Sequence, residues 1–119
     1  MSLNLRRTAK GNALSHQHVF EDVRDDDGSH RRSAAYLNAH GLLVITIHDR
    51  GPVVERAFGM SEYESTETFT ADQTARLKAT LGDDLMSAIA HRFTDSAAFA
   101  EYCTSAGVGR GTVWNRIGD

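Results

Sequence analysis

The sequence predicts an α+β fold, in which an antiparallel β meander of four to five strands is followed by two to three C-terminal helices packed on one face. Two observations support this. Apolar and polar residues alternate through much of the first half of the chain, and the period changes to that of a helix at Thr70. Because strands come first and helices last, the order argues against alternating βαβ units and so against a nucleotide-binding parallel sheet.

The first two predicted strands form a hairpin. Residues 18–24 alternate loosely and lead into the acidic run and glycine of residues 25–28. Asp-Gly between two candidate strands is a strong hairpin signal, because both residues tolerate the positive φ that primed turns require. A second strand is therefore expected at about residues 31–38, and the Asn-Ala-His-Gly segment at 38–41 predicts the next turn.

The third predicted strand, residues 42–49, has the strongest β pattern in the chain. Leu43, Ile45 and Ile47 share one face, and the other face carries Leu42, Val44, Thr46 and His48. Several β-branched residues at a period of two favour a strand, and Pro52, which has no N–H to donate, ends it. We expect the face of Leu43, Ile45 and Ile47 to pack under the helices.

Two shorter strands complete the predicted sheet. Residues 53–58 are interpreted as a short edge strand rather than a helical turn, and Gly59 ends them. Residues 62–69 alternate again, and Thr66 and Thr68 suit a strand better than a helix.

The helical part begins with a capping box. Thr70 and Gln73 have the spacing at which a Thr hydroxyl and a Gln side chain satisfy two free backbone N–H groups. The expected helices cover residues 70–81, a segment that starts at Asp83, and a segment that Thr94 or Asp95 caps and Gly107 ends. The tail, with Val113, Trp114 and Ile117, is expected to fold back on the core.

The length of 119 residues fits one domain. Residues 1–15 show no clean period and predict a flexible lead-in to a single α+β domain at 16–119. The single cysteine, Cys103, forms no intramolecular disulfide, so the fold does not depend on an oxidising compartment. No apolar run is long enough to span a membrane, and no secretory signal is recognisable. We therefore expect a cytoplasmic protein.

The charge balance bears on partners. The net charge is −3, whereas domains that bind nucleic-acid phosphates are usually basic, often with a pI above about 9. The basic clusters are only pairs, Arg6–Arg7 and Arg31–Arg32, and are interpreted as solvated surface. The sequence thus predicts no nucleic-acid partner and no membrane partner.

A resemblance to a known group of proteins rests on two segments. These are Asp49–Glu55, Asp-Arg-Gly-Pro-Val-Val-Glu, continued by Phe58–Gly59 and Tyr63–Glu64, and the ending Trp114–Asp119, Trp-Asn-Arg-Ile-Gly-Asp. Over roughly residues 40 to 119 the chain resembles a family of small hypothetical actinobacterial proteins. The resemblance implies a bacterial cytoplasmic protein and transfers no catalytic residue.

The candidate site residues are His48, Asp49, Glu55 and Tyr63. Asp49 lies at a strand end beside a Gly-Pro turn, where functional residues are often found. Its neighbour His48 points to the opposite face of a strand, so Asp49 cannot orient it directly. Glu55, with Glu62, Glu64 and Glu67, forms an acidic run around Tyr63. The simpler interpretation of Asp49 is an aspartate that caps the turn, and that of the acidic run is a solvated edge.

Other motifs fall short of a site. The chain has six histidines, and His16 and His18 would lie on one side of a strand with His30 across the Asp-Gly turn. Two ligands and a third of uncertain register are too few for a zinc site, so no metal site is predicted. The glycine-rich segment 107–112 follows a helix and lacks the lysine of a phosphate loop. Cys103 is interpreted as a buried, inert thiol. No cofactor is predicted.

The leading functional hypothesis is a non-enzymatic binding or protein-interaction module. The alternative is a small metal-binding protein or enzyme that uses His48, Asp49 and nearby acidic residues, and a third hypothesis is an antitoxin-like or immunity-like partner of another protein. We also predict a homodimer through the second face of the sheet, since Leu42 and Val44 would lie exposed there.

Overall fold

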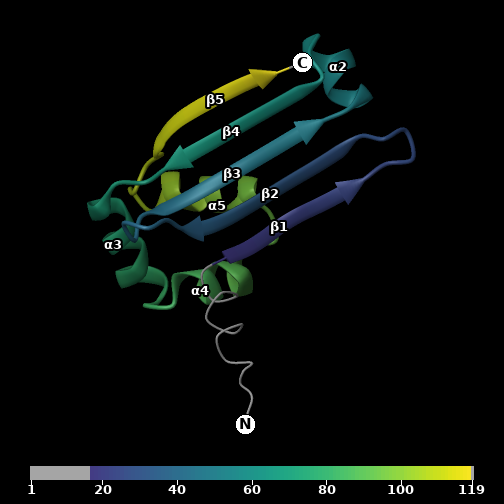
Figure 1. Ribbon diagram of the computed structural model, residues 1–119. Coiled ribbons are helices and arrows are strands. Elements are labelled where there is room, and N and C mark those ends of the chain that lie inside the picture. Colours follow the sequence, from purple (N-terminus) through teal and green to yellow (C-terminus); the bar gives the residue numbers. More distant parts are fainter. Residues whose placement is uncertain (1–16, 119) are drawn as a thin grey trace.

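The computed structural model describes residues 17–118. These residues form a five-stranded antiparallel sheet in the order β1-β2-β3-β4-β5, together with four helices (Figure 1). The strands are β1 Gln17–Arg24, β2 His30–Leu37, β3 Leu43–Arg50, β4 Glu62–Thr68 and β5 Thr112–Gly118, and the helices are α2 Pro52–Phe58, α3 Ala71–Leu81, α4 Leu85–Arg92 and α5 Ser96–Ser105. The α+β fold class is confirmed. The predicted lead-in at residues 1–15 lies outside the described residues.

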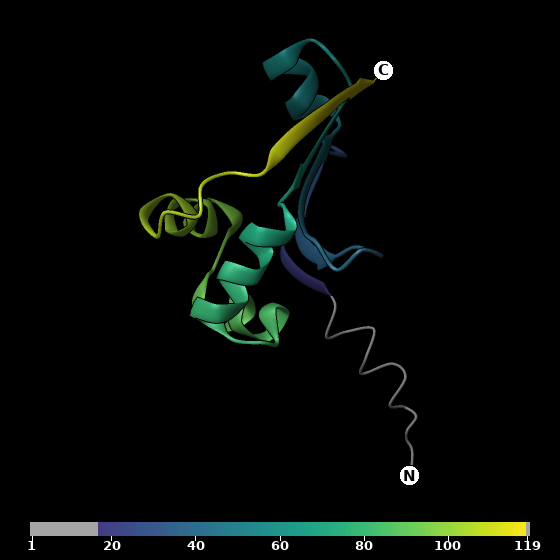
Figure 2. The ribbon, with the colours of Figure 1, turned by 90° about the vertical axis from the view of Figure 1, so that its left-hand side faces the viewer.

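All helices lie on one side of the sheet (Figure 2). Helices α3, α4 and α5 cover one end of it, and α2 lies over the opposite end (Figures 1 and 2). The other side of the sheet, on which residues 17–118 place no helix, is called the open face below. The core therefore forms between one end of the sheet and the three C-terminal helices.

The core side of β3 is the one that the sequence predicts. Leu43 and Ile45 are buried there in a cluster with Ala35, Phe69, Leu77, Leu85, Met86, Ile89, Phe99, Cys103 and Val108. Ile47 lies further along the same strand, is only half-buried, and is not a member of this cluster. Its expected place under the helices is thus wrong, because the three C-terminal helices occupy the other end of the sheet (Figure 2).

The segment predicted as an edge strand at residues 53–58 is helix α2. Its Val-Val pair favours a strand, but Pro52 occupies the first helical turn, where its missing N–H costs nothing. Gly51 has a φ of 107° and Gly59 caps the end in the left-handed region with a φ of 74°. Turn chemistry at both ends therefore overrides the β propensity of the valines.

The predicted helix boundaries agree with the structure to within about two residues. The Thr70 hydroxyl accepts the Gln73 N–H at 3.1 Å and the Gln73 side chain accepts the Thr70 N–H at 2.9 Å, which is the predicted capping box. Asp84 caps α4, and Asp95, one of the two predicted residues, caps α5. The tail does not fold back on the core as expected: it forms β5, which pairs with β4 along its whole length and leaves Val113 and Trp114 exposed.

The loop between α5 and β5 is fixed by a buried carboxylate. Glu67 is 6% exposed and accepts hydrogen bonds from Arg110 Nε at 2.9 Å, Arg110 Nη2 at 2.8 Å and the Gly111 N–H at 2.7 Å. The Gln73 amide donates to the carbonyls of Val108 and Arg110. We call Glu67, Arg110 and Gly111 the Glu67 clamp. It holds the chain in position to enter β5.

Gly111 has no room for a side chain, and this gives a testable prediction. A Cβ at this position would lie 2.5 Å from the Thr68 carbonyl oxygen. Gly111→Ala should therefore push the loop off β4 and lower the free energy of unfolding by about 1–3 kcal/mol, as overpacking does. Urea denaturation measures this, and a variant as stable as the wild type would show that the loop shifts at no cost.

Candidate functional site

A pocket opens between α2 and the end of the sheet. Its volume is about 210 Å³, and its lining comes from β1, β2, β3, the first hairpin turn and α2: Glu21, Val23, Asp25, Ser29, His30, Arg31, Asp49, Arg50, Val53, Val54 and Ala57. Helix α2, which contributes to this lining, lies at the end of the sheet that the C-terminal helices leave uncovered (Figure 2). We call it the α2 pocket.

Three charged side chains from three neighbouring strands meet in the α2 pocket. Arg31 on β2 lies directly opposite Asp49 on β3 in the ladder. Its Nε donates to Glu21 of β1 at 2.9 Å, and its Nη1 donates to Asp49 Oδ2 at 3.3 Å. The Arg31 side chain is 51% exposed and that of Asp49 only 13%, so the guanidinium bridges one outer and one inner carboxylate.

The second oxygen of Asp49 is buried without a partner. Among the buried side-chain oxygen and nitrogen atoms of the described residues, Asp49 Oδ1 alone has no hydrogen-bond partner. A buried acceptor that makes no hydrogen bond costs about 1–3 kcal/mol. The α2 pocket therefore contains an acceptor whose hydrogen-bonding capacity the fold itself leaves unused.

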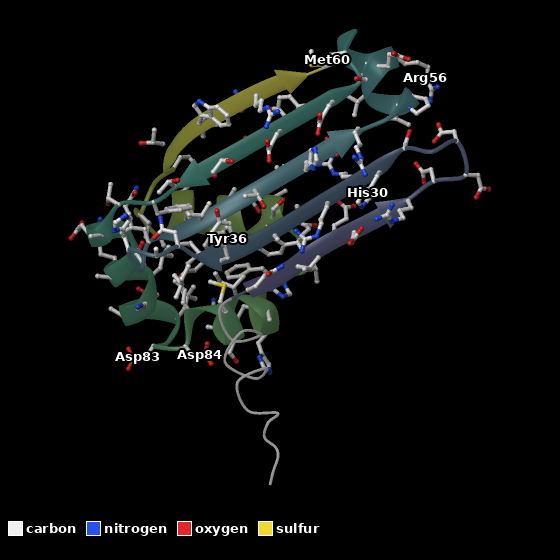
Figure 3. The ribbon with its side chains drawn as sticks, viewed as in Figure 1. His30, Tyr36, Arg56, Met60, Asp83 and Asp84 are labelled. Atoms are coloured by element: carbon white, nitrogen blue, oxygen red, sulfur yellow. The ribbon has the colours of Figure 1, made fainter. Side chains whose placement is uncertain are left out.

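Helix α2 supplies the apolar wall of the α2 pocket. Val54 is buried, whereas Val53 is 45% exposed. The helix is tied to the first hairpin turn, because the Val53 N–H donates to the Ser29 hydroxyl at 3.0 Å and Arg56 lies 3.6 Å from Asp27. Arg56 projects at the α2 end of the molecule (Figure 3). The pocket is thus built on a helix that two contacts anchor to the first hairpin turn.

The structure separates the predicted candidates. Asp49 lines the α2 pocket. His48, the preceding residue of the same strand, points to the open face, as the alternation of a strand predicts, and its Nε2 lies 2.5 Å from Glu62 Oε2 in a hydrogen bond. Tyr63 on β4 pairs with Asp49 on β3 in the ladder. Its hydroxyl donates a hydrogen bond to Asn115 Oδ1 at 3.2 Å, and it does not line the pocket. Glu55 is exposed on α2, outside the lining. His48 and Asp49 therefore cannot act together on one bound group.

Sequence reasoning missed Arg31 and Glu21. From the sequence alone, the pair Arg31–Arg32 is interpreted as solvated surface. Because the two residues are neighbours on β2, their side chains point to opposite faces of the sheet. Arg32 lies on the open face, 3.7 Å from Asp22. The signal that could have found Arg31 is the register of the second hairpin, because a turn at residues 38–41 places Arg31 opposite Asp49.

The histidines and the cysteine show other environments. Among the described residues no three His, Cys, Asp or Glu side chains gather as a metal site would require. His18 packs edge-on against Phe20, with 4.9 Å between the two ring centroids, and burial lowers the pKa of His18. His16 lies outside the described residues. Cys103 is buried in the core, where burial and then the charge of Glu67 raise its pKa to about 11. The thiol is protonated at neutral pH, as an inert cysteine is.

The open face differs from the prediction. Val44 lies between Tyr36 and Thr68 in the ladder and is only 2% exposed. Tyr36 and His30 mark the two ends of β2 on this face (Figure 3). The exposed large apolar residues on it are Val19 of β1 and Trp114 of β5, at opposite edges of the sheet. The exposed patch around Val44, on which the predicted face-to-face dimer rested, is therefore absent.

Comparison with protein-family models, with curated proteins and with solved structures finds no match for this chain. The resemblance to small actinobacterial proteins stays a prediction. In the described part of the chain no helix has the length and apolar character needed to cross a membrane.

Proposed function

We propose that this protein is a non-enzymatic protein-interaction module whose α2 pocket receives one cationic side chain, a lysine or an arginine, of a partner protein. The observation that carries the proposal is the buried, unpartnered Asp49 Oδ1 at the pocket. A group that donates hydrogen bonds and carries a positive charge would complete this carboxylate, and charge-assisted hydrogen bonds are stronger than neutral ones.

The size of the α2 pocket favours a side chain over a metabolite. Pockets for small molecules and cofactors usually have about 300–1,000 Å³, whereas this one has about 210 Å³. Single anchor side chains buried in small pockets are typical of the residues that dominate binding at protein interfaces. Val23, Val53 and Ala57 provide an apolar surface along which the aliphatic part of a lysine or arginine would lie.

The charges around the α2 pocket also favour a cation. The lining contains three acidic residues, Glu21, Asp25 and Asp49, and two arginines, Arg31 and Arg50. Arg31 already bonds Glu21 and one oxygen of Asp49. The other Asp49 oxygen is buried without a hydrogen bond, so a positive group would have to enter deep into the pocket to meet it, and Asp25 adds a further negative charge to the lining. The chain as a whole has a net charge of −3, which would steer a basic partner toward it.

We further place this module in the bacterial cytoplasm. The chain has one cysteine, so its fold needs no disulfide. The resemblance of residues 40 to 119 to small actinobacterial proteins supports a bacterial source. No nucleic-acid partner is proposed, in keeping with the negative net charge.

The proposal is tested with fragments that mimic the two cationic side chains. Titration with n-butylammonium and n-propylguanidinium should produce saturable NMR shifts of the Asp49, Val53 and Ala57 amides, and n-butanol and butyrate should not. Asp49→Asn keeps the shape but removes the charge and should weaken binding about tenfold, the equivalent of about 1.4 kcal/mol. Glu64→Gln on the open face is the matched control and should leave binding unchanged.

Two results would contradict the proposal. Equal binding of n-butanol would show that the α2 pocket selects apolar groups rather than cations. Binding of the cations that Asp49→Asn leaves unaltered would show that they bind elsewhere. Selection of random peptides on the wild type and on Asp49→Asn then tests the protein partner, because enrichment of a lysine or arginine anchor should require Asp49.

A further inference from the structure

The two edges of the sheet are built differently. The β1 edge contains a break in the ladder between Val19 and Glu21 and ends in charged residues. Bulges and charges are devices that keep an exposed strand edge from pairing with another chain. The β5 edge has neither feature over most of its length: its pairing with β4 runs without a shift from Thr112 to Gly118, and Arg116 is the only charged residue in that segment.

The β5 edge also exposes apolar surface. Residues 112–116 are all exposed, and Trp114, at 59%, and Val113, at 48%, are the most exposed large apolar side chains of the described residues. Trp114 is the single tryptophan of the chain. A regular edge strand with an exposed tryptophan is a surface that readily adds another strand.

We propose that two copies of this chain pair antiparallel through β5, with the twofold axis passing beside Asn115. Asn115 is the middle residue of the strand Thr112–Gly118, so this register pairs every residue of one copy's β5 with a residue of the other. It places Trp114 directly opposite Arg116 of the second copy, on the open face. The two sheets then join into one continuous sheet.

Charge complementarity favours a second copy as the occupant. Arg116 is 67% exposed at its side chain and lies 3.8 Å from Glu64 on β4, so it is only loosely held in one chain. In the dimer its guanidinium would lie between Glu64 of its own chain and the ring of Trp114 of the second copy. Arginine over a tryptophan ring is an attractive pair. The axis repeats this contact, and twofold pairing is the commonest form of oligomer.

The paired edge and the α2 pocket are independent. The pocket is lined by β1, β2, β3, the hairpin turn and α2, and no residue of β5 belongs to it. The pocket would therefore stay open in the dimer, and failure of one proposal leaves the other intact. Unlike the predicted face-to-face dimer, the β5 interface needs no exposed apolar patch around Val44, which is buried.

Light scattering and the emission of Trp114 test this interface. We expect a mass of about twice the 13.1 kDa of one chain at micromolar concentration, and a blue shift of the tryptophan emission as the dimer forms. Trp114→Arg places like charges opposite each other and should give a folded monomer. Combining it with Arg116→Glu restores opposite charges and should restore the dimer. Val19→Arg, on the β1 edge of the same face, should leave the dimer unchanged.

Three outcomes would overturn the proposal. A wild-type monomer removes the interface altogether. A dimer whose tryptophan emission does not change with concentration places the contact on another surface, a result that needs no variant to fold. A double variant that stays monomeric while circular dichroism shows it folded contradicts the register centred on Asn115.

Discussion

Replacing Phe99 by alanine should lower the free energy of unfolding by about 3–5 kcal/mol, the range for removing a fully buried phenylalanine. Phe99 is 1% exposed and lies at the centre of an aromatic group, with ring centroids 6.2 Å from Phe69 and 5.2 Å from Phe93. Phe69 follows β4 and Phe93 follows α4, so Phe99 joins the sheet to two helices. Its loss leaves a cavity that no single helix can close by shifting.

Chemical denaturation monitored by circular dichroism measures this cost. Val19→Ala removes an apolar side chain that is already 39% exposed, and it should change stability by less than about 0.5 kcal/mol, as surface substitutions do. A cost for Phe99→Ala below about 1 kcal/mol would show that the helical layer repacks, and it would contradict the core described above.

The fold could be predicted largely because its signals are local. The capping box at Thr70 and Gln73 and the alternation of Leu43 and Ile45 each depend on a few neighbouring residues, and the structure contains them. The error at residues 53–58 has the same origin. Two valines indicate a strand, but Pro52 and the glycines on either side determine the helix.

The candidate site could be predicted only in part because it depends on register. Asp49 stands out in the sequence at its strand end, but the two residues that accompany it lie on other strands. Arg31 is opposite Asp49. Glu21 lies on β1 opposite Ser33, two residues along β2 from Arg31, directly after the break in the ladder near Val19. Periodicity places a residue on a face, whereas pairing between strands decides which residues on that face meet.

The exposure of Val44 could not be predicted for a related reason. The sequence assigns Val44 correctly to the face opposite Leu43, and an uncovered sheet face is expected to expose it. In the ladder it lies between Tyr36 and Thr68 and is 2% exposed. A central strand receives cover from the side chains of both neighbours, so apolar exposure moves to the edge strands, where Trp114 lies.

The Glu67 clamp should make stability depend on pH in a way that one variant isolates. Burial raises the pKa of Glu67, but the hydrogen bonds from Arg110 and Gly111 and the charge of Arg110 outweigh it, so the pKa lies below its ordinary value of 4.5. A carboxyl group whose pKa is lowered by folding stabilises the fold above the pKa of the unfolded chain. That stabilisation is lost as the pH falls from about 4.5 through the lower folded value.

Glu67→Gln should therefore cost about 1–3 kcal/mol at neutral pH. The substitution removes the negative charge, and it replaces one acceptor oxygen by an NH2 group, which faces N–H donors and cannot accept from them. The lower part of this range is expected, since the Arg110 side chain is 54% exposed and solvent screens the pair. The difference between variant and wild type should shrink as the pH falls from 4.5 through the lower pKa of the folded protein, below which the wild-type carboxyl is also uncharged. Asp22, Asp27 and Glu62 also have lowered pKa values and contribute to acid sensitivity in both proteins, so only this difference reports on Glu67. Glu64→Gln, which removes an ion pair with the exposed Arg116 at 3.8 Å, is the control and should cost less than about 0.5 kcal/mol at any pH. Urea titrations at neutral and acid pH make the comparison, and a difference that stays constant across the acid range would show that Glu67 acts through its shape rather than its charge.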